Sequence, residues 1–159
     1  MSLAQGPRRL PRRPLLFKPR LRTRVWGGQT LKTRVPDPPD APVGESWEVS
    51  DEDGALTRTP DGLTLRDLMR DHREDLVGRA FDAGRPERFP LLLKLLDARA
   101  DLSVQVHPND EHAQRLRPDA AGKTECWYVL DADPGARIYR GLAPGTTAGQ
   151  LEAAARRGD

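Results

Sequence analysis

Cysteine is nearly absent from this chain, which has Cys126 alone among its 159 residues. A single cysteine excludes a disulfide within the chain and fits a reducing compartment, so we expect a cytoplasmic location. Long hydrophobic runs are lacking as well. Stretches such as FPLLL and WYVL fall far short of the roughly 20 apolar residues that a transmembrane helix needs. We therefore expect no contact with a membrane.

An excess of one charge is also lacking, because the formal net charge is only +2. This balance does not predict nucleic-acid binding by the chain as a whole. Hydrophobic residues make up 36% and charged residues 31%, the usual mixture for a soluble domain of this length. Lysine is scarce, with four residues against 22 arginines. Where arginine is the usual cation, a lysine is suited to contact a phosphate or an oxyanion, because its ammonium is a compact positive charge.

The first 24 residues contain basic side chains throughout and no acidic one. Such a segment can be a basic arm or a targeting leader. Its prolines, among them Pro7, Pro11 and Pro14, break the amphipathic helix that a transit peptide would form. We therefore predict a solvated, disordered arm over residues 1–16.

The remaining chain predicts several strands and one strong helix. The proline-rich residues 34–44 predict a loop, and residues 64–78 predict a helix with Thr64 as N-cap, Gly78 at its end and His72 at the edge of its apolar face. Strands are predicted at residues 45–51, 90–97, 102–108, 125–131 and 136–142, with short helical segments near residues 110–116 and 151–159. Strands without crossover helices predict an antiparallel sandwich or barrel.

Polar residues inside these apolar strands are the candidate site. In LSVQVHPND, alternation places Ser103, Gln105 and His107 on one face of a strand that ends at Pro108. Lys94 stands among leucines, where an unpaired ammonium would be costly to bury. It either lies on an edge strand and reaches water, or it has a compensating partner.

A second strand adds an acidic residue to this set. In GKTECWYVL, alternation places Lys123, Glu125 and Trp127 on one face. Together with Gln105 and His107, Glu125 forms a nitrogen and oxygen ligand set suited to zinc or a similar divalent ion. The alternative interpretation is a surface ion pair.

Four motifs in order, RVWGGQTL, GESWEVSD, PLLLKLLDARADLSVQVHPND and GKTECWYVL, resemble the first part of the type I mannose-6-phosphate isomerases, zinc-dependent members of the cupin superfamily. The resemblance runs from Phe17 to Leu142. It implies a mainly β, cupin-type jelly roll with a small helical insertion. The implied zinc ligands are Gln105, His107 and Glu125. The implied sugar-phosphate pocket contains Trp26, Glu45 and Ser103 as substrate-binding residues and Lys94 and Lys123 as catalytic residues.

The activity implied by this family is the interconversion of mannose 6-phosphate and fructose 6-phosphate through an enediol. The family takes a further zinc-binding histidine and an arginine from a later part of the jelly roll. Residues 143–159 are accordingly expected to be a truncated tail, and the chain an incomplete enzyme completed by a C-terminal segment or a second chain. The alternative hypothesis is a non-catalytic cupin remnant that binds metal or sugar phosphate.

Overall fold

The computed structural model describes residue 10, residues 14–79 and residues 88–158. The chain divides into two compact units, Met1–Val104 and Gln105–Asp159, and each is described by itself. Most of the arm predicted over residues 1–16 lies outside the described residues. None of the described helices is long and apolar enough to cross a membrane.

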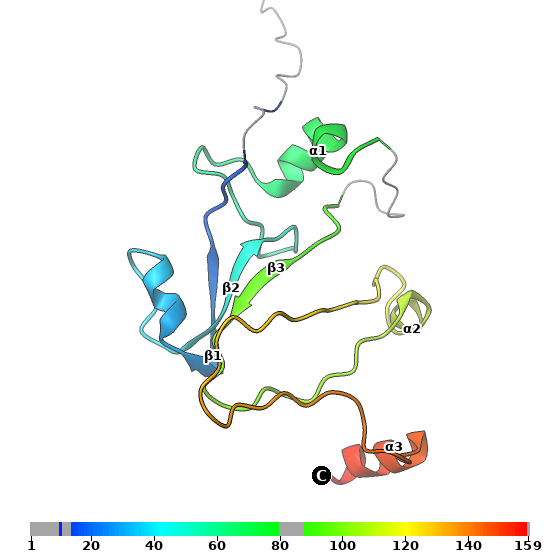
Figure 1. Cartoon of the computed structure of the whole chain (residues 1–159). Helices are drawn as coiled ribbons and strands as arrows, with labels where there is room; N and C mark the ends of the chain where they lie inside the picture. The colour runs from blue at the N-terminus through cyan, green and yellow to red at the C-terminus, as the bar shows by residue number, and fades with distance from the viewer. Residues whose placement is uncertain (1–9, 11–13, 80–87, 159) are drawn as a thin grey trace, which may run out of the picture. The chain divides into compact units, whose positions relative to one another are not determined.

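The first unit contains a three-stranded antiparallel sheet (Figure 1). Its strands are β1 (Arg20–Gly28), β2 (Val43–Val49) and β3 (Leu93–Leu96), in the order β1-β2-β3. Strands β2 and β3 confirm the strands predicted at residues 45–51 and 90–97. A short 3-10 helix, η1 (Thr30–Arg34), and a loop rich in proline connect β1 to β2.

The chain leaving β3 binds the backbones of both other strands. The Asp97 N–H donates to the Gly44 carbonyl on β2 at 2.9 Å, and the Gly28 N–H on β1 donates to the Asp97 carbonyl at 3.1 Å. Just beyond, the Arg99 N–H donates to the Trp26 carbonyl at 2.8 Å. These bonds hold three backbones closely together at one end of the sheet.

Helix α1 (Leu65–Val77) confirms the helix predicted from the sequence. Its capping box is present: the Thr64 hydroxyl accepts the Asp67 N–H at 3.0 Å, and the Asp67 carboxylate accepts the Thr64 N–H at 2.9 Å. The Thr64 hydroxyl also donates to the Asp67 carboxylate at 2.6 Å, and this bond together with that of the Thr64 N–H holds the pKa of Asp67 below its ordinary value. His72 is half-buried, as predicted, and marks a kink in the helix.

The buried apolar side chains of the described first unit come from its helices, from β2 and from the loop after β2. Leu65, Leu68 and Met69 are buried along one side of α1, which is the apolar stripe expected from the sequence. Val43 on β2 is also fully buried. Leu31 of η1 and Ala55 complete this set, and burial of these apolar side chains stabilises the unit.

Asp51 joins the end of β2 to α1 and to the segment entering β3. Its carboxylate accepts the Arg66 Nε–H and the Phe89 N–H, both at 2.8 Å. Arg66 and Arg88 also bind Asp53, and their hydrogen bonds hold the pKa of that carboxyl below its ordinary value. The Asp51 side chain is only 3% exposed, so its partners replace water almost completely.

The second unit contains two helices, α2 (Asp110–Leu116) and α3 (Ala148–Arg157). Both lie where the sequence predicts short helical segments. Helix α3 begins with a capping box formed by Thr147 and Gln150 and ends at Gly158.

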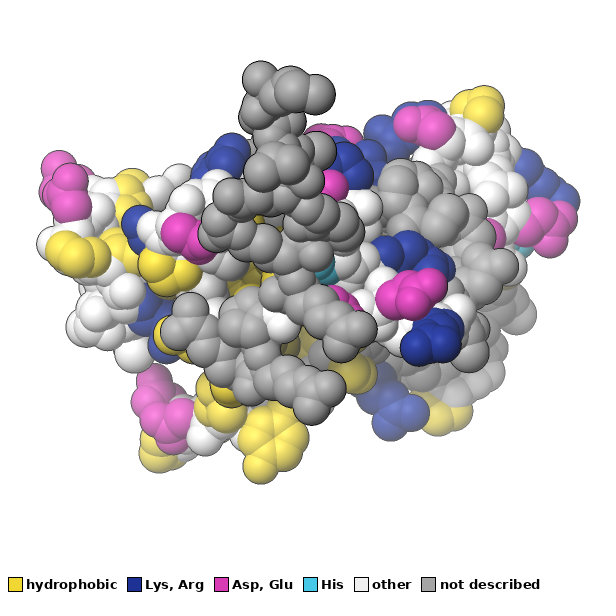
Figure 2. Space-filling view, turned by 90° about the horizontal axis from the view of Figure 1, so that it is seen from above, with side chains coloured by type: hydrophobic (Ala, Val, Ile, Leu, Met, Phe, Trp, Pro, Cys, Tyr) yellow, Lys and Arg dark blue, Asp and Glu magenta, His cyan; other side chains and the backbone are white. Residues whose placement is uncertain are grey.

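The prediction of strands at residues 102–108, 125–131 and 136–142 is wrong for this structure. These segments carry no strand assignment, although their sequences suit one. A strand needs a hydrogen-bonded neighbour, and none of these segments has a backbone ladder to another in the described part of the chain. Their apolar side chains stay exposed, for example Tyr128 at 87% and Leu130 at 76%. Figure 2 shows hydrophobic side chains at the surface beside charged ones.

Candidate functional site

Glu45 is the centre of a charged cluster in the first unit. One carboxylate oxygen, Oε2, accepts hydrogen bonds from Arg24 Nη2 at 2.5 Å and from Trp47 Nε1 at 3.3 Å. The other oxygen, Oε1, lies 3.2 Å from Lys94 Nζ. Because Arg24, Glu45 and Lys94 come from β1, β2 and β3 respectively, the cluster spans all three strands of the sheet.

The structure decides between the two interpretations of Lys94. Strand β3 is at the edge of the three-stranded sheet, but the Lys94 side chain is only 18% exposed. Its ammonium is paired with Glu45, whose side chain is 8% exposed. The ammonium charge of Lys94 is therefore compensated by a buried carboxylate and does not depend on contact with water.

Trp26 lies against the backbone of β2 beside this cluster. A side chain added at Gly44 would meet the Trp26 ring at 2.5 Å and Arg24 Cβ and Cγ at 2.7 Å. Glycine at position 44 therefore allows both side chains to pass close to the strand. Ser103, another residue of the implied pocket, lies in the exposed extended segment that ends this unit.

His107 and Glu125 form the centre of a second cluster, in the second unit. His107 Nε2 lies 2.8 Å from Glu125 Oε2, and Lys123 Nζ lies 3.3 Å from Glu125 Oε1. The side chains of His107 and Glu125 are 26% and 19% exposed. Gln105 is exposed on the same extended segment as His107, two residues earlier. The structure thus brings His107, Glu125 and Lys123 together, and their roles as ligands and catalytic residue stay a prediction.

A loop closed between Pro108 and Lys123 places His107 beside Glu125. The Lys123 N–H donates to the Pro108 carbonyl at 3.0 Å, and the Gly122 N–H donates to the Asp110 carboxylate at 2.8 Å. Helix α2 lies within this loop, and the Asn109 side chain caps the N-terminus of the helix. Gly122 packs against the turn so closely that a Cβ would lie 2.6 Å from Asn109 C and Asp110 N. The loop therefore requires glycine at this position.

We expect Gly122→Ala to weaken any zinc binding by the His107–Glu125 pair about tenfold, because it forces the loop apart at the base of this pair. The measurement is zinc affinity by competition with a chromophoric chelator. Gly149→Ala is the matched control, since a Cβ at Gly149 meets nothing within 4 Å. Equal affinities for the two variants would show that this closure does not position the pair.

The donor chemistry of the second cluster fits a divalent metal ion. His107 Nε2 and Glu125 Oε2 lie at hydrogen-bonding distance, 2.8 Å, so the pair also fits the alternative interpretation of an ion pair. A divalent ion bound by both atoms would take the place of this hydrogen bond, and the Gln105 amide oxygen is a third ligand atom of a suitable kind. Among the described residues no group of three or more histidine, cysteine, aspartate or glutamate side chains is arranged to hold a metal. The residues therefore fit as a set of two strong ligands, with an amide two positions before His107 in the chain.

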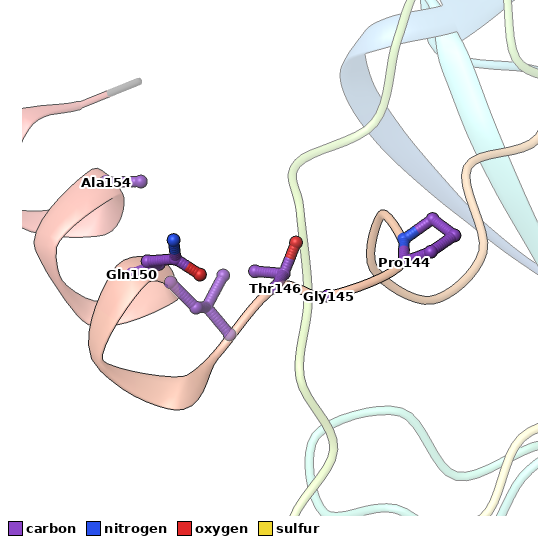
Figure 3. A pocket seen from close by; sticks show the side chains of 6 residues that line it. Pro144, Gly145, Thr146, Gln150 and Ala154 are labelled. Carbon is purple, nitrogen blue, oxygen red and sulfur yellow. The ribbon is translucent and has the colours of Figure 1, made fainter.

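A separate hollow of about 390 Å3 lies beside helix α3 (Figure 3). It is lined by Pro144, Gly145, Thr146, Gln150, Leu151 and Ala154. None of these lining residues has a titratable side chain, and none belongs to the two clusters. We assign no chemistry to this hollow.

The first unit is built on an antiparallel sheet that carries paired acidic and basic groups, and the second unit holds a histidine–glutamate pair. Comparison with known families makes the class specific. The chain belongs to the type I phosphomannose isomerases: residues 15–131 match the family model described as "Phosphomannose isomerase type I, catalytic domain".

Several curated proteins and one solved structure are similar to the chain. It is 41% identical over 132 residues to the mannose-6-phosphate isomerase ManA of Bacillus subtilis, covering 80% of this chain and 40% of that protein. It is 37% identical over 133 residues to the mannose-6-phosphate isomerase of Streptococcus mutans, with the same coverage of 80% and 40%. The chain thus spans about two fifths of the length of these relatives.

The crystal structure of the mannose 6-phosphate isomerase from Bacillus subtilis superimposes on the chain with a TM-score of 0.65 and 36% identity. The alignment covers 76% of this chain and 38% of that structure. This likeness confirms the predicted fold class, and the family model confirms the predicted family.

Arg24 and Trp47 belong to the Glu45 cluster, and the sequence did not predict either of them there. Both donate to Glu45 Oε2. Trp47 follows Glu45 by two residues on β2, so alternation along the strand could have placed the two side chains on one face. Arg24 is one of 22 arginines, and its spacing does not distinguish it from its neighbours on β1.

Proposed function

We propose that the chain contributes to a zinc-dependent mannose-6-phosphate isomerase site, which interconverts mannose 6-phosphate and fructose 6-phosphate through an enediol. The observation that carries this proposal is the contact of His107, Glu125 and Lys123 in a chain of this family. The names of its relatives support the substrate.

The proposed metal ligands are Gln105, His107 and Glu125. Zinc bound there would supply a Lewis acid that polarises the sugar carbonyl. The protein holds the two stronger ligands in place: the loop base at Pro108 and Lys123 fixes the spacing of the two segments. Lys123 contacts the far carboxylate oxygen of Glu125 and so also restrains the rotation of that side chain.

The proposed substrate-binding residues are Trp26, Glu45 and Ser103, and the proposed catalytic residues are Lys94 and Lys123. Glu45 accepts from two cations, so the Arg24–Glu45–Lys94 cluster has a net positive charge. Such a charge attracts an anionic sugar phosphate and stabilises negative charge that develops during the reaction. The low exposure of Lys94 strengthens its interactions, because less water screens the charge.

The function is tested by assaying conversion of mannose 6-phosphate with added zinc. The match covers only 40% of ManA, so a complementary segment is tested as well. One sample contains the 159-residue chain alone, and the other contains the chain together with the part of ManA that lies outside the match. Turnover in either sample supports the proposal, and turnover only in the mixture also identifies a complementary segment as a partner. If neither sample is active but the chain still binds zinc or sugar phosphate, the non-catalytic alternative holds.

We expect Lys94→Ala and Lys123→Ala each to raise the activation barrier by about 2 to 4 kcal/mol, because each removes a charge that stabilises the reacting group. The matched control is Lys32→Ala, since the Lys32 ammonium binds the Asp40 carbonyl outside both clusters. The measurement is kcat/KM for mannose 6-phosphate in the active sample. Equal values for the three variants would remove both lysines from the proposed catalytic set.

A further inference from the structure

Arg24 contacts the carboxylate that pairs with Lys94. Its Nη2 atom lies 2.5 Å from Glu45 Oε2, while Lys94 Nζ lies 3.2 Å from Oε1 of the same side chain. A carboxylate held at both oxygens by groups from the two flanking strands has little freedom to rotate. The position of Lys94 therefore depends on a bond made on the opposite side of Glu45.

The stem of Arg24 is also fixed by the fold. Gly44 lets Arg24 Cβ and Cγ pass over β2, where an added Cβ would lie 2.7 Å from both atoms. The Trp47 indole donates to the same oxygen, Oε2, at 3.3 Å. Two donors from different strands thus converge on one oxygen and define its position.

We propose that Arg24 is a positioning residue: it holds Glu45 Oε2 so that Oε1 fixes the ammonium of Lys94. This inference rests on the proposed function, in which Lys94 acts in catalysis. A residue that positions a catalytic group lowers kcat when it is removed, whereas a residue that binds the substrate phosphate directly raises KM. The two roles can therefore be separated by kinetics.

The test compares Arg24→Ala, Arg24→Lys and Arg34→Ala. Arg34 is a matched control because it also pairs with a glutamate of β2, Glu48, and both arginine side chains are 40% exposed. We expect Arg24→Ala to lower kcat between about 10- and 100-fold with KM near the wild-type value. Lysine at position 24 should recover part of the loss, because an ammonium can pair with Glu45 but lacks the planar fork. Arg34→Ala should leave kcat unchanged.

A second readout does not require turnover. The Trp47 indole proton reports the position of Glu45 Oε2, and its NMR resonance is identified by its loss in Trp47→Phe. We expect this resonance to move in Arg24→Ala, to return toward its wild-type position in Arg24→Lys, and to stay unchanged in Arg34→Ala.

These results distinguish failure of the inference from failure of the proposed function. An unchanged indole resonance in Arg24→Ala, an unchanged kcat, or a rise in KM alone would overturn the positioning role. If the wild-type chain is inactive both alone and in the mixture, the proposed function fails. The indole resonance then still decides whether Arg24 holds Glu45.

Discussion

Replacing His107 by alanine should lower the zinc affinity of the chain by about 100-fold or more, because it removes one of two strong donors that lie 2.8 Å apart. The remaining carboxylate of Glu125 would bind zinc weakly, together with water and the amide of Gln105. Competition with a chromophoric chelator measures the affinity. Glu125→Gln should cause a comparable loss, since an amide keeps the shape of the side chain but not its charge.

His112→Ala is the matched control for this experiment. His112 lies in the same unit, but its Nδ1 atom is 2.8 Å from the Asn109 side-chain oxygen and it has no part in the His107–Glu125 pair. We expect the control to keep the wild-type affinity. If His107→Ala and His112→Ala bind zinc equally well, the assignment of the metal ligands is wrong.

Asp51→Ala should lower the free energy of unfolding by about 3 kcal/mol, because it leaves the Arg66 guanidinium and the Phe89 N–H without their buried acceptor. Arg66 is 32% exposed, so water and Asp53 compensate part of its charge. Urea unfolding followed by tryptophan fluorescence gives the difference. Asp51→Asn should cause a smaller loss, since its side-chain oxygen can still accept one of the two bonds.

Asp53→Ala provides the comparison within the same network. Its side chain binds Arg66 and Arg88 but is 69% exposed, so water can replace the lost contacts. We expect a clearly smaller effect than that of Asp51→Ala. Similar losses for the two alanine variants would contradict the role assigned to burial of Asp51.

The sequence predicted local structure well where short-range signals determine it. The Thr64–Asp67 capping box, the apolar stripe and Gly78 together define α1, and each acts within a few residues. The strands at residues 102–108, 125–131 and 136–142 were predicted from the same kind of local signal, but a strand also needs a partner backbone. Side-chain pattern alone carries no information on whether that partner is present.

The candidate site was predicted partly from alternation and partly from family resemblance. Alternation suggested that Lys123 and Glu125 share a face of a strand. The structure assigns no strand to this segment, yet it places Lys123 Nζ 3.3 Å from Glu125 Oε1. The pairing of Glu45 with Arg24 depends on the register between β1 and β2, which includes a bulge near Arg22 and Thr23. Register irregularities of this kind are set by tertiary packing, so the sequence pattern does not reveal them.

The loop that brings His107 to Glu125 also differs from the Glu45–Lys94 contact in the entropy that its closure costs. Those two residues are 18 positions apart, whereas Lys94 and Glu45 are 49 apart. Loop-closure entropy grows with the logarithm of length, so the shorter closure costs about 1 kcal/mol less. We therefore expect the His107–Glu125 loop to close faster than the Glu45–Lys94 contact when the denatured chain refolds.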